Sequence, residues 1–423
     1  MSPPVRVCID ARLPDGGGGV QTFILNLARG LAELGDDDLE LTFLVFARHH
    51  EWLLEALPAG ARLAEVPFAG PDASVSAAER LAMRVREMPA VHRVLAPAYR
   101  RLRGFDVPEA ELRAVPQAPE AFSALAPDVM HFTHQSGFAT TVPSIYHPHD
   151  LQHLHFPELF DEEVLALRAA HYGPLARQAA VVVVGTSWVK TDVVEKLGVP
   201  QEKVHVVPMA PPAWRAEAPA PLPDGVPGGL FALYPAVMWP HKNHLRLVDA
   251  IAALRGRGFE QPLVLTGGTG PAAGAVRDRI AQLGVGDLIT VLGFVSEGQL
   301  RVLQRAAHMT VVPTLFESAS FPVWEAFEAG VPVAASTSTS LPQQVGDAGV
   351  LFDPLDVDAM ADAIQMLATD DALRARLVQR GRQRLAELSW RGSAERYAAL
   401  YARLAGRNLT ERQREVLTAP APL

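Results

Sequence analysis

Residues 316–332 read Phe-Glu-Ser-Ala-Ser-Phe-Pro-Val-Trp-Glu-Ala-Phe-Glu-Ala-Gly-Val-Pro. The segment predicts a loop that leads into a helix, with Glu317 in the loop and Glu325 inside the helix. The start of a helix offers unpaired backbone N–H groups and a partial positive charge that suit a diphosphate, and carboxylates beside it accept hydrogen bonds from sugar hydroxyls. An ordinary amphipathic helix, with Trp324 and Phe327 buried and the carboxylates in solvent, is the alternative.

This stretch resembles the signature of the nucleotide-sugar-dependent glycosyltransferases of family 4, in which the glutamate pair is followed by Ala, Gly and Pro. The resemblance implies that Glu317 contacts the donor sugar and Glu325 the ribose hydroxyls. It also implies that the helix start at Ser320, Phe321 and Pro322 binds the donor. Transfer in this family retains the configuration of the sugar and uses no metal ion, so we expect neither a cofactor nor a metal site.

Length and composition favour a large globular protein. The chain has 423 residues, of which 49% are hydrophobic and 20% charged, and this suits two domains rather than one core. The formal net charge of -9 argues against general affinity for nucleic acids, because no basic excess exists to release counterions from phosphates. The single cysteine, Cys8, excludes an internal disulfide and indicates a reducing, cytoplasmic environment. We expect neither a signal peptide nor a membrane-spanning segment.

Short apolar strands alternate with longer helical patterns along the chain, which predicts parallel sheets wrapped by helices. The first series of expected strands is Val5 to Asp10, Leu39 to Phe46, Asp128 to Phe132, Ser144 to His147, Ala180 to Gly185 and Val204 to Pro208. The second series is Phe231 to Val237, Leu263 to Gly267, Ile289 to Gly293, Met309 to Pro313 and Val331 to Ser336. We therefore expect two doubly wound halves.

A segment rich in proline and glycine, Met209 to Gly229, separates the two series and is typical of a linker. It predicts one domain over residues 1–210 and a second over residues 228–392. The resemblance implies the same α/β architecture, the GT-B fold, in which two Rossmann-like domains with doubly wound parallel sheets face each other across a cleft. The first domain would bind the acceptor and the second the nucleotide sugar. In that fold the last helix often returns to the first domain, and we expect this of residues 393–415.

Four glycines follow the first expected strand, at residues 16–19, before a helical pattern begins. Glycine lets the backbone approach a bulky anion closely and aim N–H groups at it. A flexible surface loop has the same composition, so the position after the strand is what favours a binding role. The resemblance implies that Gly17, Gly18 and Gly19 face the donor diphosphate and the acceptor.

The segment Pro240-His241-Lys242-Asn243 follows another expected strand and precedes a second helical pattern. A lysine at a helix start is a natural phosphate ligand, and the alternative is a solvated lysine at an exposed helix start. The family carries a lysine here that neutralises the diphosphate leaving group, usually with an arginine five residues earlier. This chain has Val237 at that place and Ala236 where glycine is common, and His241 is a candidate substitute donor.

A dense group of polar side chains lies near one expected strand end: His147, His149, Asp150, His153 and His155. Imidazoles and a carboxylate are ligands for zinc, but half of the group lies on the strand end with a proline and no separated second ligand pair is visible. A His-Asp-Leu sequence at a strand end instead resembles an active-site motif of the family. The resemblance marks His149 as the histidine that touches the donor sugar, with Asp150 orienting the loop or accepting a hydrogen bond from the acceptor hydroxyl.

Residues 80–105 interleave arginines with apolar side chains at nearly helical spacing. A basic amphipathic segment can rest on anionic lipid headgroups, and the alternative is a helical pair packed on the sheet with solvated arginines. Membrane contact would make the protein peripheral on the inner face of the membrane and would favour a lipid-linked acceptor.

The leading hypothesis is a retaining hexosyltransferase that moves a sugar from a GDP- or UDP-linked donor, with GDP-mannose favoured, to a glycan or a lipid-linked saccharide. Breaking the anomeric bond develops negative charge on the departing diphosphate, which donors aimed at the phosphate stabilise. The candidate catalytic residues are His149, Asp150, Lys242 and Glu317. A nucleotide-sugar epimerase on the same fold and a catalytically degenerate nucleotide-binding scaffold stay open as alternatives, and Val237 and Ala236 favour the latter.

Overall fold

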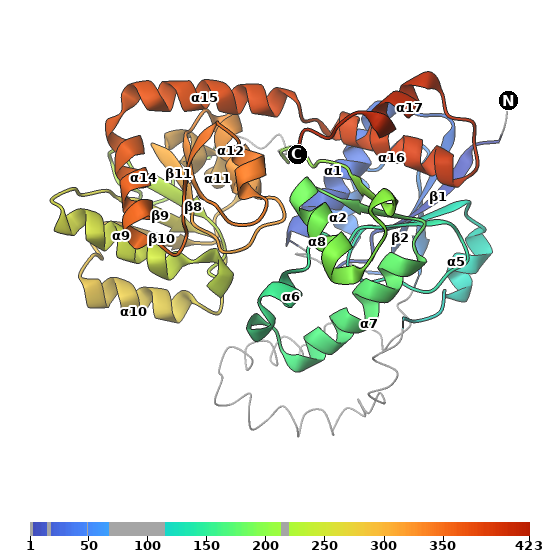
Figure 1. The fold of residues 1–423 in the computed structure, drawn as a ribbon, viewed down its shortest axis with the longest axis horizontal. Coiled ribbons are helices and arrows are strands. Elements are labelled where there is room, and N and C mark those ends of the chain that lie inside the picture. Colours follow the sequence, from blue (N-terminus) through green and yellow to red (C-terminus); the bar gives the residue numbers. More distant parts are fainter. Residues whose placement is uncertain (1–2, 15–17, 49, 67–114, 213–219) are drawn as a thin grey trace.

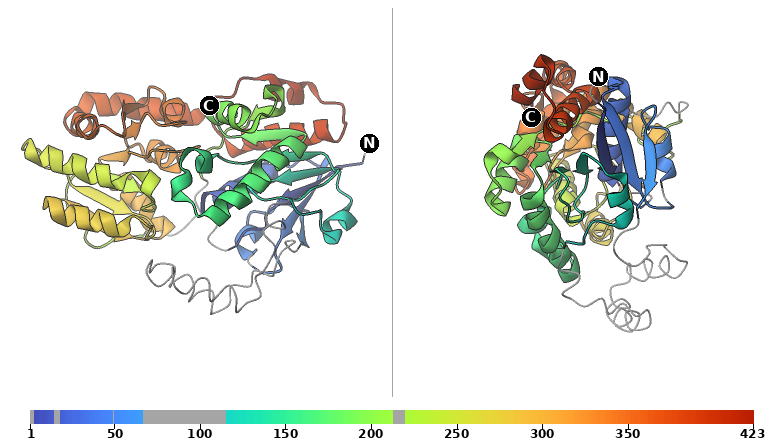
Figure 2. Two further views of the ribbon diagram at one scale, coloured as in Figure 1. Left: turned by 60° about the horizontal axis from the view of Figure 1, so that its bottom comes forward. Right: turned by 90° about the vertical axis from the view of Figure 1, so that its right-hand side faces the viewer.

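The structure is a computed structural model that describes residues 3–14, 18–48, 50–66, 115–212 and 220–423. In this part of the chain the strands form two parallel sheets, one of seven strands and one of six. Helices surround each sheet, and the two α/β halves lie side by side (Figures 1 and 2). The predicted architecture of two doubly wound parallel sheets is confirmed.

The first sheet has the strand order β3-β2-β1-β4-β5-β6-β7. Its strands are β1 (Val5–Asp10), β2 (Leu39–Val45), β3 (Arg62–Glu65), β4 (Val129–Phe132), β5 (Ser144–Tyr146), β6 (Val181–Val184) and β7 (Val204–Val206). The order reverses between β1 and β4, which is the point where doubly wound sheets bind ligands. The sequence did not predict β3, because this edge strand is exposed at both ends and lacks the apolar run of a buried parallel strand.

The helices of the first half include α1, which follows β1 and buries an apolar face that contains Phe23 and Leu27. The helix α7 is as long as α1, at 17 residues, α8 has 11 residues, and the remaining segments are short helices or turns. The helices are α1 (Gly18–Leu34), α2 (Glu51–Leu54), α5 (Glu120–Leu125), α6 (Gln152–His155), α7 (Glu162–Gln178) and α8 (Ser187–Leu197), with the 3-10 turns η1 (Pro157–Leu159) and η2 (Gln201–Lys203). Thr186 caps α8 by accepting a hydrogen bond from the backbone N–H of Val189 at 3.3 Å.

The second sheet has the strand order β10-β9-β8-β11-β12-β13 and reverses between β8 and β11. Its strands are β8 (Ala232–Pro235), β9 (Leu263–Thr266), β10 (Ile289–Gly293), β11 (Met309–Val312), β12 (Val333–Ser336) and β13 (Gly349–Phe352). The sequence did not predict β13, because this edge strand buries only Phe352 fully and follows closely on a glycine-containing turn. Most of the strands that it did predict contain runs of buried apolar residues, such as β11, in which every residue is buried, although the predicted strand β10 buries only Ile289 fully.

The helices of the second half connect these strands and cover the sheet. They are η3 (Pro240–Lys242), α9 (His244–Gly256), α10 (Ala273–Leu283), α11 (Glu297–Ala306), α12 (Phe321–Ala329), α13 (Leu341–Val345), α14 (Val357–Thr369) and α15 (Asp371–Ala386). The helix α12 has Pro322 in its first turn and ends at Gly330, whose φ of 72° is the left-handed conformation that glycine adopts readily. Proline and glycine therefore define the two ends of α12, the helix that contains Glu325 and that Glu317 precedes.

The C-terminal segment leaves the second half along α15 and packs on the first half (Figure 1). The helix α16 (Trp390–Leu404) lies against α1 and β1 and is tied to the first half by side chains. The Ser393 hydroxyl donates to the carbonyl of Pro208 at 2.6 Å, and the Tyr401 hydroxyl lies 2.8 Å from Nδ1 of His131. The expected single helix over residues 393–415 is two helices, because the chain turns at Gly406, which has a φ of 70°, before α17 (Glu411–Thr418).

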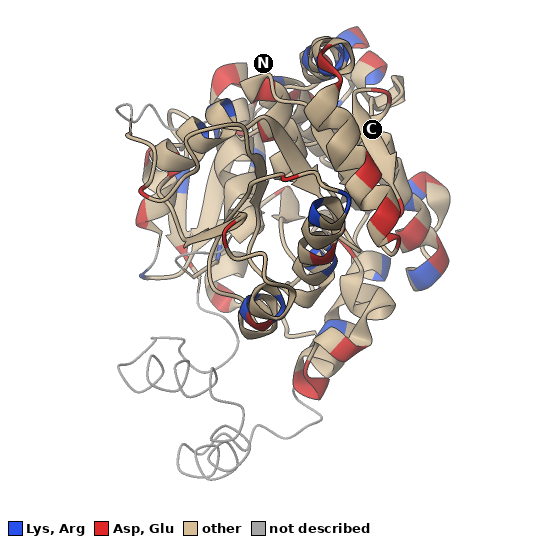
Figure 3. Cartoon of the chain, turned by 90° about the vertical axis from the view of Figure 1, so that its left-hand side faces the viewer, with Lys and Arg blue, Asp and Glu red and all other residues tan. Residues whose placement is uncertain are grey.

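Several predictions from the sequence cannot be compared with the structure, and others can be compared only within the described residues. Residues 80–105 and Gly17 lie outside the described residues, and the two domain boundaries stay predictions. Within the described part, no helix combines the length and the apolar character needed to cross a bilayer. Cys8 is 2% exposed on β1, as a small buried apolar side chain would be. Figure 3 shows acidic and basic residues mixed along the helices of the second half.

Candidate active site

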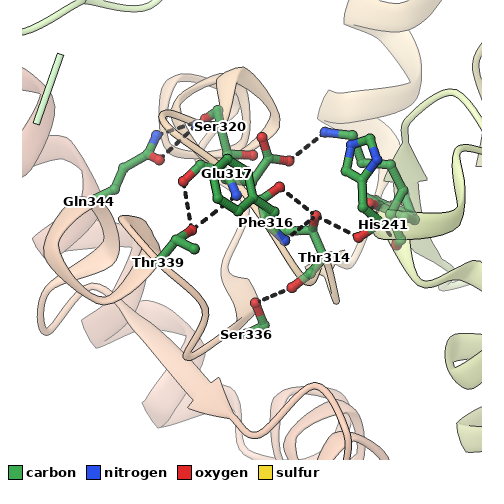
Figure 4. Close-up of polar contacts among 10 residues, drawn as sticks. His241, Thr314, Phe316, Glu317, Ser320, Ser336, Thr339 and Gln344 are labelled. Carbon is green, nitrogen blue, oxygen red and sulfur yellow. Dashed lines mark hydrogen bonds and ion pairs between the residues drawn. The ribbon is translucent and has the colours of Figure 1, made fainter. Parts of the chain in front are cut away.

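The second half brings two predicted site residues together at the carboxyl ends of its strands. Lys242 follows β8 and Glu317 follows β11, the two strands that flank the switch point of this sheet. The Lys242 ammonium (Nζ) donates to Oε1 of Glu317 at 2.5 Å, and the two side chains are 21% and 12% exposed. Burial raises the pKa of Glu317, and the ammonium partly offsets this shift. The structure thus forms a compact, largely buried ion pair just before α12 (Figure 4).

The backbone around Glu317 is tied to the loop that carries Lys242. The carbonyl of His241 accepts hydrogen bonds from the backbone N–H of Leu315 at 2.7 Å and from the Thr314 hydroxyl at 3.0 Å. Burial lowers the pKa of His241 to about 3, and the neighbouring Lys242 charge acts in the same direction. His241 is therefore a neutral imidazole near pH 7, which donates or accepts a hydrogen bond but adds no positive charge.

Ser320 stands at the N-terminal end of α12, with Phe321 and Pro322 in the first turn. Its side chain makes no capping hydrogen bond to the helix. The residue is 1% exposed, and within the described part of the chain its hydroxyl oxygen has no hydrogen-bond partner. Because buried polar groups are usually paired, this hydroxyl and the adjacent helix start are suited to an incoming ligand with acceptor oxygens.

Glu325 lies inside α12 and is only 8% exposed. Its Oε2 accepts a hydrogen bond of 2.6 Å from the side-chain amide of Gln304, which comes from α11. Burial raises the pKa of Glu325 to about 7, although the hydrogen bond from Gln304 lowers it. The alternative predicted that the carboxylate of Glu325 lies in solvent, and this is wrong because Glu325 is buried. The same alternative predicted that Trp324 and Phe327 are buried, and both are.

The glycine loop of the first half lies beside the helix start of the second. Gly18 begins α1 with a φ of 58°, a left-handed conformation that side chains disfavour. A Cβ atom placed on Gly19 would lie 3.9 Å from the ring of Phe321. The turn after β1 and the first turn of α12 therefore approach each other, as the predicted binding role requires.

His149 and Asp150 lie in the turn after β5. The Nε2 atom of His149 lies 2.7 Å from the carbonyl oxygen of Thr133, and since a carbonyl only accepts, Nε2 carries the hydrogen and Nδ1 is left as an acceptor. Burial lowers the pKa of His149 to about 4. Burial also raises the pKa of Asp150, while the positive charge of Lys242 from the other half lowers it. The structure thus brings Asp150 into electrostatic reach of the ion pair.

The remaining histidines of the predicted cluster have separate partners. The rings of His147 and His149 stack with centroids 4.1 Å apart, and His153 packs against Tyr172 at 4.5 Å. His155 places its Nε2 atom 2.8 Å from a carboxylate oxygen of Asp192. Among the described residues, no three His, Cys, Asp or Glu side chains gather as a metal site would require.

Sequence reasoning missed a buried ion pair at the end of β1. The Arg12 guanidinium contacts the carboxylate of Asp10 at 2.6 Å, and neither side chain is more than 2% exposed. Burial alone would raise the pKa of Asp10, but Arg12 and His134 hold it well below its usual range. The sequence could have indicated this pair, because Asp10 and Arg12 are opposite charges placed between an apolar strand and a glycine-rich loop.

Sequence reasoning also missed the contacts between the two halves beside Glu317. The ring of Phe316 packs against those of His155 and Trp188, with centroids 5.3 Å and 5.8 Å apart. The hydroxyls of Thr186 and Ser340 lie 3.0 Å apart. These contacts join α6 and α8 of the first half to the loops that follow β11 and β12, and a single sequence carries no signal for them.

Comparison with known proteins places the chain in a family. The model for glycosyl transferases group 1 matches residues 226–384, and the model for glycosyltransferase family 4 matches residues 17–210. The chain is 35% identical over 161 residues to O-antigen chain mannosyltransferase B of Escherichia coli, a match that covers 38% of this chain and 42% of that protein. It is 29% identical over 238 residues to an MMP alpha-(1->4)-mannosyltransferase of Mycolicibacterium hassiacum, covering 55% of this chain and 56% of that protein. The chain thus matches about half the length of these curated relatives.

Solved structures share the fold over almost the whole chain. Sucrose-phosphate synthase from Thermosynechococcus elongatus superposes with a TM-score of 0.64 at 18% identity, covering 95% of this chain and 99% of that chain. The Anabaena protein HepE, in complex with UDP and glucose, has a TM-score of 0.64 at 16% identity and covers 94% of this chain and 99% of that chain. Since two family models together match most of the chain and its two parallel sheets form the GT-B fold, the protein belongs to the glycosyltransferases of family 4.

Proposed function

We propose that the protein is a retaining hexosyltransferase that moves a sugar from a nucleotide sugar to a glycan or a lipid-linked saccharide. The observation that carries this proposal is the ion pair of Lys242 and Glu317 at the start of α12, next to the buried unpaired hydroxyl of Ser320. A cation, a carboxylate and a helix N-terminus in one place suit a ligand that has both a diphosphate and a sugar. The matched family models support the same activity.

In this proposal the donor diphosphate lies against Lys242, the Ser320 hydroxyl and the first turn of α12 at Phe321 and Pro322. Gly18 and Gly19 approach the same anion from the first half, because their backbone leaves room for it. The buried carboxylate of Glu325, about one helical turn further on, accepts hydrogen bonds from the ribose hydroxyls. His241 is a neutral neighbour of this site.

Lys242 and the start of α12 stabilise the negative charge that develops on the diphosphate as the anomeric bond breaks. Glu317 and the Nδ1 atom of His149 accept hydrogen bonds from hydroxyls of the transferred sugar. Asp150 accepts a hydrogen bond from the acceptor hydroxyl, which attacks on the face that the diphosphate leaves. We propose that this charge stabilisation operates without a metal ion and that the configuration of the sugar is retained.

The sugar and the nucleotide are finer parts of the proposal. Two relatives are named mannosyltransferases, which favours GDP-mannose as the donor. The fold neighbour HepE is described in complex with UDP and glucose, so a UDP-linked hexose is the second choice. The relative named for the O-antigen chain favours an acceptor of polysaccharide biosynthesis. Peripheral contact with the inner face of a membrane through residues 80–105 belongs to the same proposal.

The test is calorimetric binding of GDP, UDP, ADP and dTDP to the wild type and to Lys242→Ala and Glu325→Ala. We expect selective binding of one nucleotide and a loss of about tenfold in affinity for each variant, since each removes a charged hydrogen-bond partner. The exposed Asp278 provides a matched control, and Asp278→Ala should bind as the wild type does. Acceptor-dependent consumption of the corresponding nucleotide sugar would then establish transfer. Failure of all four nucleotides to bind the wild type would overturn the proposal.

A further inference from the structure

Gln344 holds the N-terminal end of α12 through two hydrogen bonds. It lies in α13 and is fully buried. The backbone N–H of Ser320 donates to Oε1 of Gln344 at 2.8 Å, and the Gln344 side-chain amide donates to the carbonyl of Ser320 at 2.7 Å. One side chain thus binds the backbone N–H and the carbonyl of Ser320, which belong to the two peptide units on either side of its Cα, and fixes the orientation of the backbone at the helix start (Figure 4).

Two neighbours of Gln344 bind the same loop in a similar way. The hydroxyl of Thr339 donates to the carbonyl of Glu317 at 2.6 Å and accepts from the backbone N–H of Glu317 at 3.0 Å. The hydroxyl of Ser336 donates to the carbonyl of Thr314 at 2.6 Å. Side chains at the end of β12 and in the segment after it therefore hold the backbone that follows β11 at three points.

These hydrogen bonds engage the backbone and leave the Ser320 hydroxyl without a partner among the described residues. Figure 4 shows Gln344 and His241 on opposite sides of the loop that carries Phe316 and Glu317. Gln344 thus acts from behind the loop, while the side of Lys242 stays available to a ligand. A buried unpaired hydroxyl is unfavourable, and a ligand oxygen at this place would satisfy it.

We propose that Gln344 is a positioning residue for the donor diphosphate. It orients the backbone of Ser320 so that the N–H of Phe321, at the start of α12, and the Ser320 hydroxyl converge on the terminal phosphate group. The inference rests on the proposed function, because it assumes that a nucleoside diphosphate binds at this helix start. Gln344 does not touch the diphosphate and acts only through the peptide that it holds.

The test compares Gln344→Met, which keeps the size of the side chain but makes no hydrogen bonds, with the wild type. The probes are the nucleoside diphosphate that the wild type binds best, chosen from GDP, UDP, ADP and dTDP, and the matching monophosphate. We expect Gln344→Met to weaken diphosphate binding by about tenfold or more, since small misplacement of binding groups has large effects. Monophosphate binding should change by less than about threefold, because the base and ribose contacts lie elsewhere. General loss of structure would weaken both probes alike.

Two further variants make the result decisive. Gln261→Met is the control, because Gln261 is also buried and, among the described residues, its side-chain amide bonds only the carbonyl of its neighbour Pro262. Gln344→Glu keeps the acceptor for the Ser320 N–H and regains a donor only when its carboxyl is protonated. Its diphosphate affinity relative to the wild type should therefore rise as the pH falls from about 8 to about 6.

The outcomes separate the inference from the function on which it rests. A wild type that binds no nucleotide overturns the proposed function itself. If the wild type binds, and folded Gln344→Met binds the diphosphate equally well or loses both probes equally, the positioning role is wrong. If Gln344→Met does not fold, Gln344→Glu decides: a relative affinity that does not change with pH contradicts the role.

Discussion

The carboxyl of Glu325 should make the protein less stable above neutral pH, and Glu325→Gln should remove this penalty. The pKa of the buried carboxyl rises from 4.5 to about 7, so the folded protein binds a proton that the unfolded chain releases between these values. Stability therefore falls as the pH rises through this window, and the full penalty is present above the folded pKa. Since one pKa unit corresponds to about 1.4 kcal/mol, the penalty amounts to about 3 kcal/mol.

The assay is urea unfolding, monitored by tryptophan fluorescence, for the wild type and Glu325→Gln at about pH 5 and about pH 8. The stability of the variant relative to the wild type should increase by about 2.5 kcal/mol between the two conditions, because a small part of the penalty is already present at about pH 5. For a domain of 150–250 residues this corresponds to roughly 5–10 °C in melting temperature. The neutral amide still accepts the hydrogen bond from Gln304, so the comparison isolates the charge.

A matched control removes a carboxylate from solvent in the same half of the molecule. Asp278 is exposed on α10, and Asp278→Asn should follow the wild type at both pH values. Parallel pH dependences for the wild type and Glu325→Gln would refute the reasoning, because they would mean that burial does not raise the pKa of this carboxyl. The stabilised variant should also bind nucleotide more weakly, since an amide is a poorer acceptor for ribose hydroxyls than a carboxylate.

The ion pair and the packing of the C-terminal segment lead to two further predictions. Lys242→Met should lower stability by about 1–3 kcal/mol at pH 8, because Glu317 keeps a largely buried charge without its cation. Urea unfolding should show a smaller loss in acid, where the carboxyl is protonated, and a loss that does not depend on pH would contradict this prediction. Gly30→Ala should cost about 1–3 kcal/mol in a thermal melt, because the added Cβ would overlap the backbone carbonyl of Trp390 in α16. The control is Gly274→Ala, at a helical position where an added Cβ would meet nothing within 4 Å, and it should not destabilise the protein. If the two glycine variants have the same melting temperature, the close approach of α1 and α16 is ruled out.

Local pattern was sufficient for much of the fold. Buried parallel strands are continuous apolar runs, so β6, which consists of four buried valines, was predictable from sequence. The same is true of the ends of α12, where Pro322 and Gly330 are local signals. Two edge strands, β3 and β13, were missed and two others, β7 and β10, were predicted, because an edge strand is defined largely by the neighbour with which it pairs and its own sequence signal varies.

The candidate site divides in the same way. The sequence singled out Glu317, Glu325, Lys242 and His149 through their resemblance to motifs of the family, together with their places after strands or in the expected helix. It did not determine that Lys242 and Glu317, 75 residues apart, form an ion pair, because this depends on β8 and β11 being neighbours in the sheet. Their roles in transfer remain predictions until nucleotide binding is measured.

The sequence by itself determined which chemical groups the protein has and which strands and helices carry them, because hydrophobic period, proline and glycine act over a few residues. Only the tertiary structure decided the state of those groups. The Gln304 amide donates a hydrogen bond to the carboxylate of Glu325, and the Thr133 carbonyl determines the tautomer of His149. Gln344 in turn fixes the peptide at the start of α12. Burial and hydrogen bonding between segments far apart in the chain arise only when the sheets and helices pack, and no local pattern encodes them.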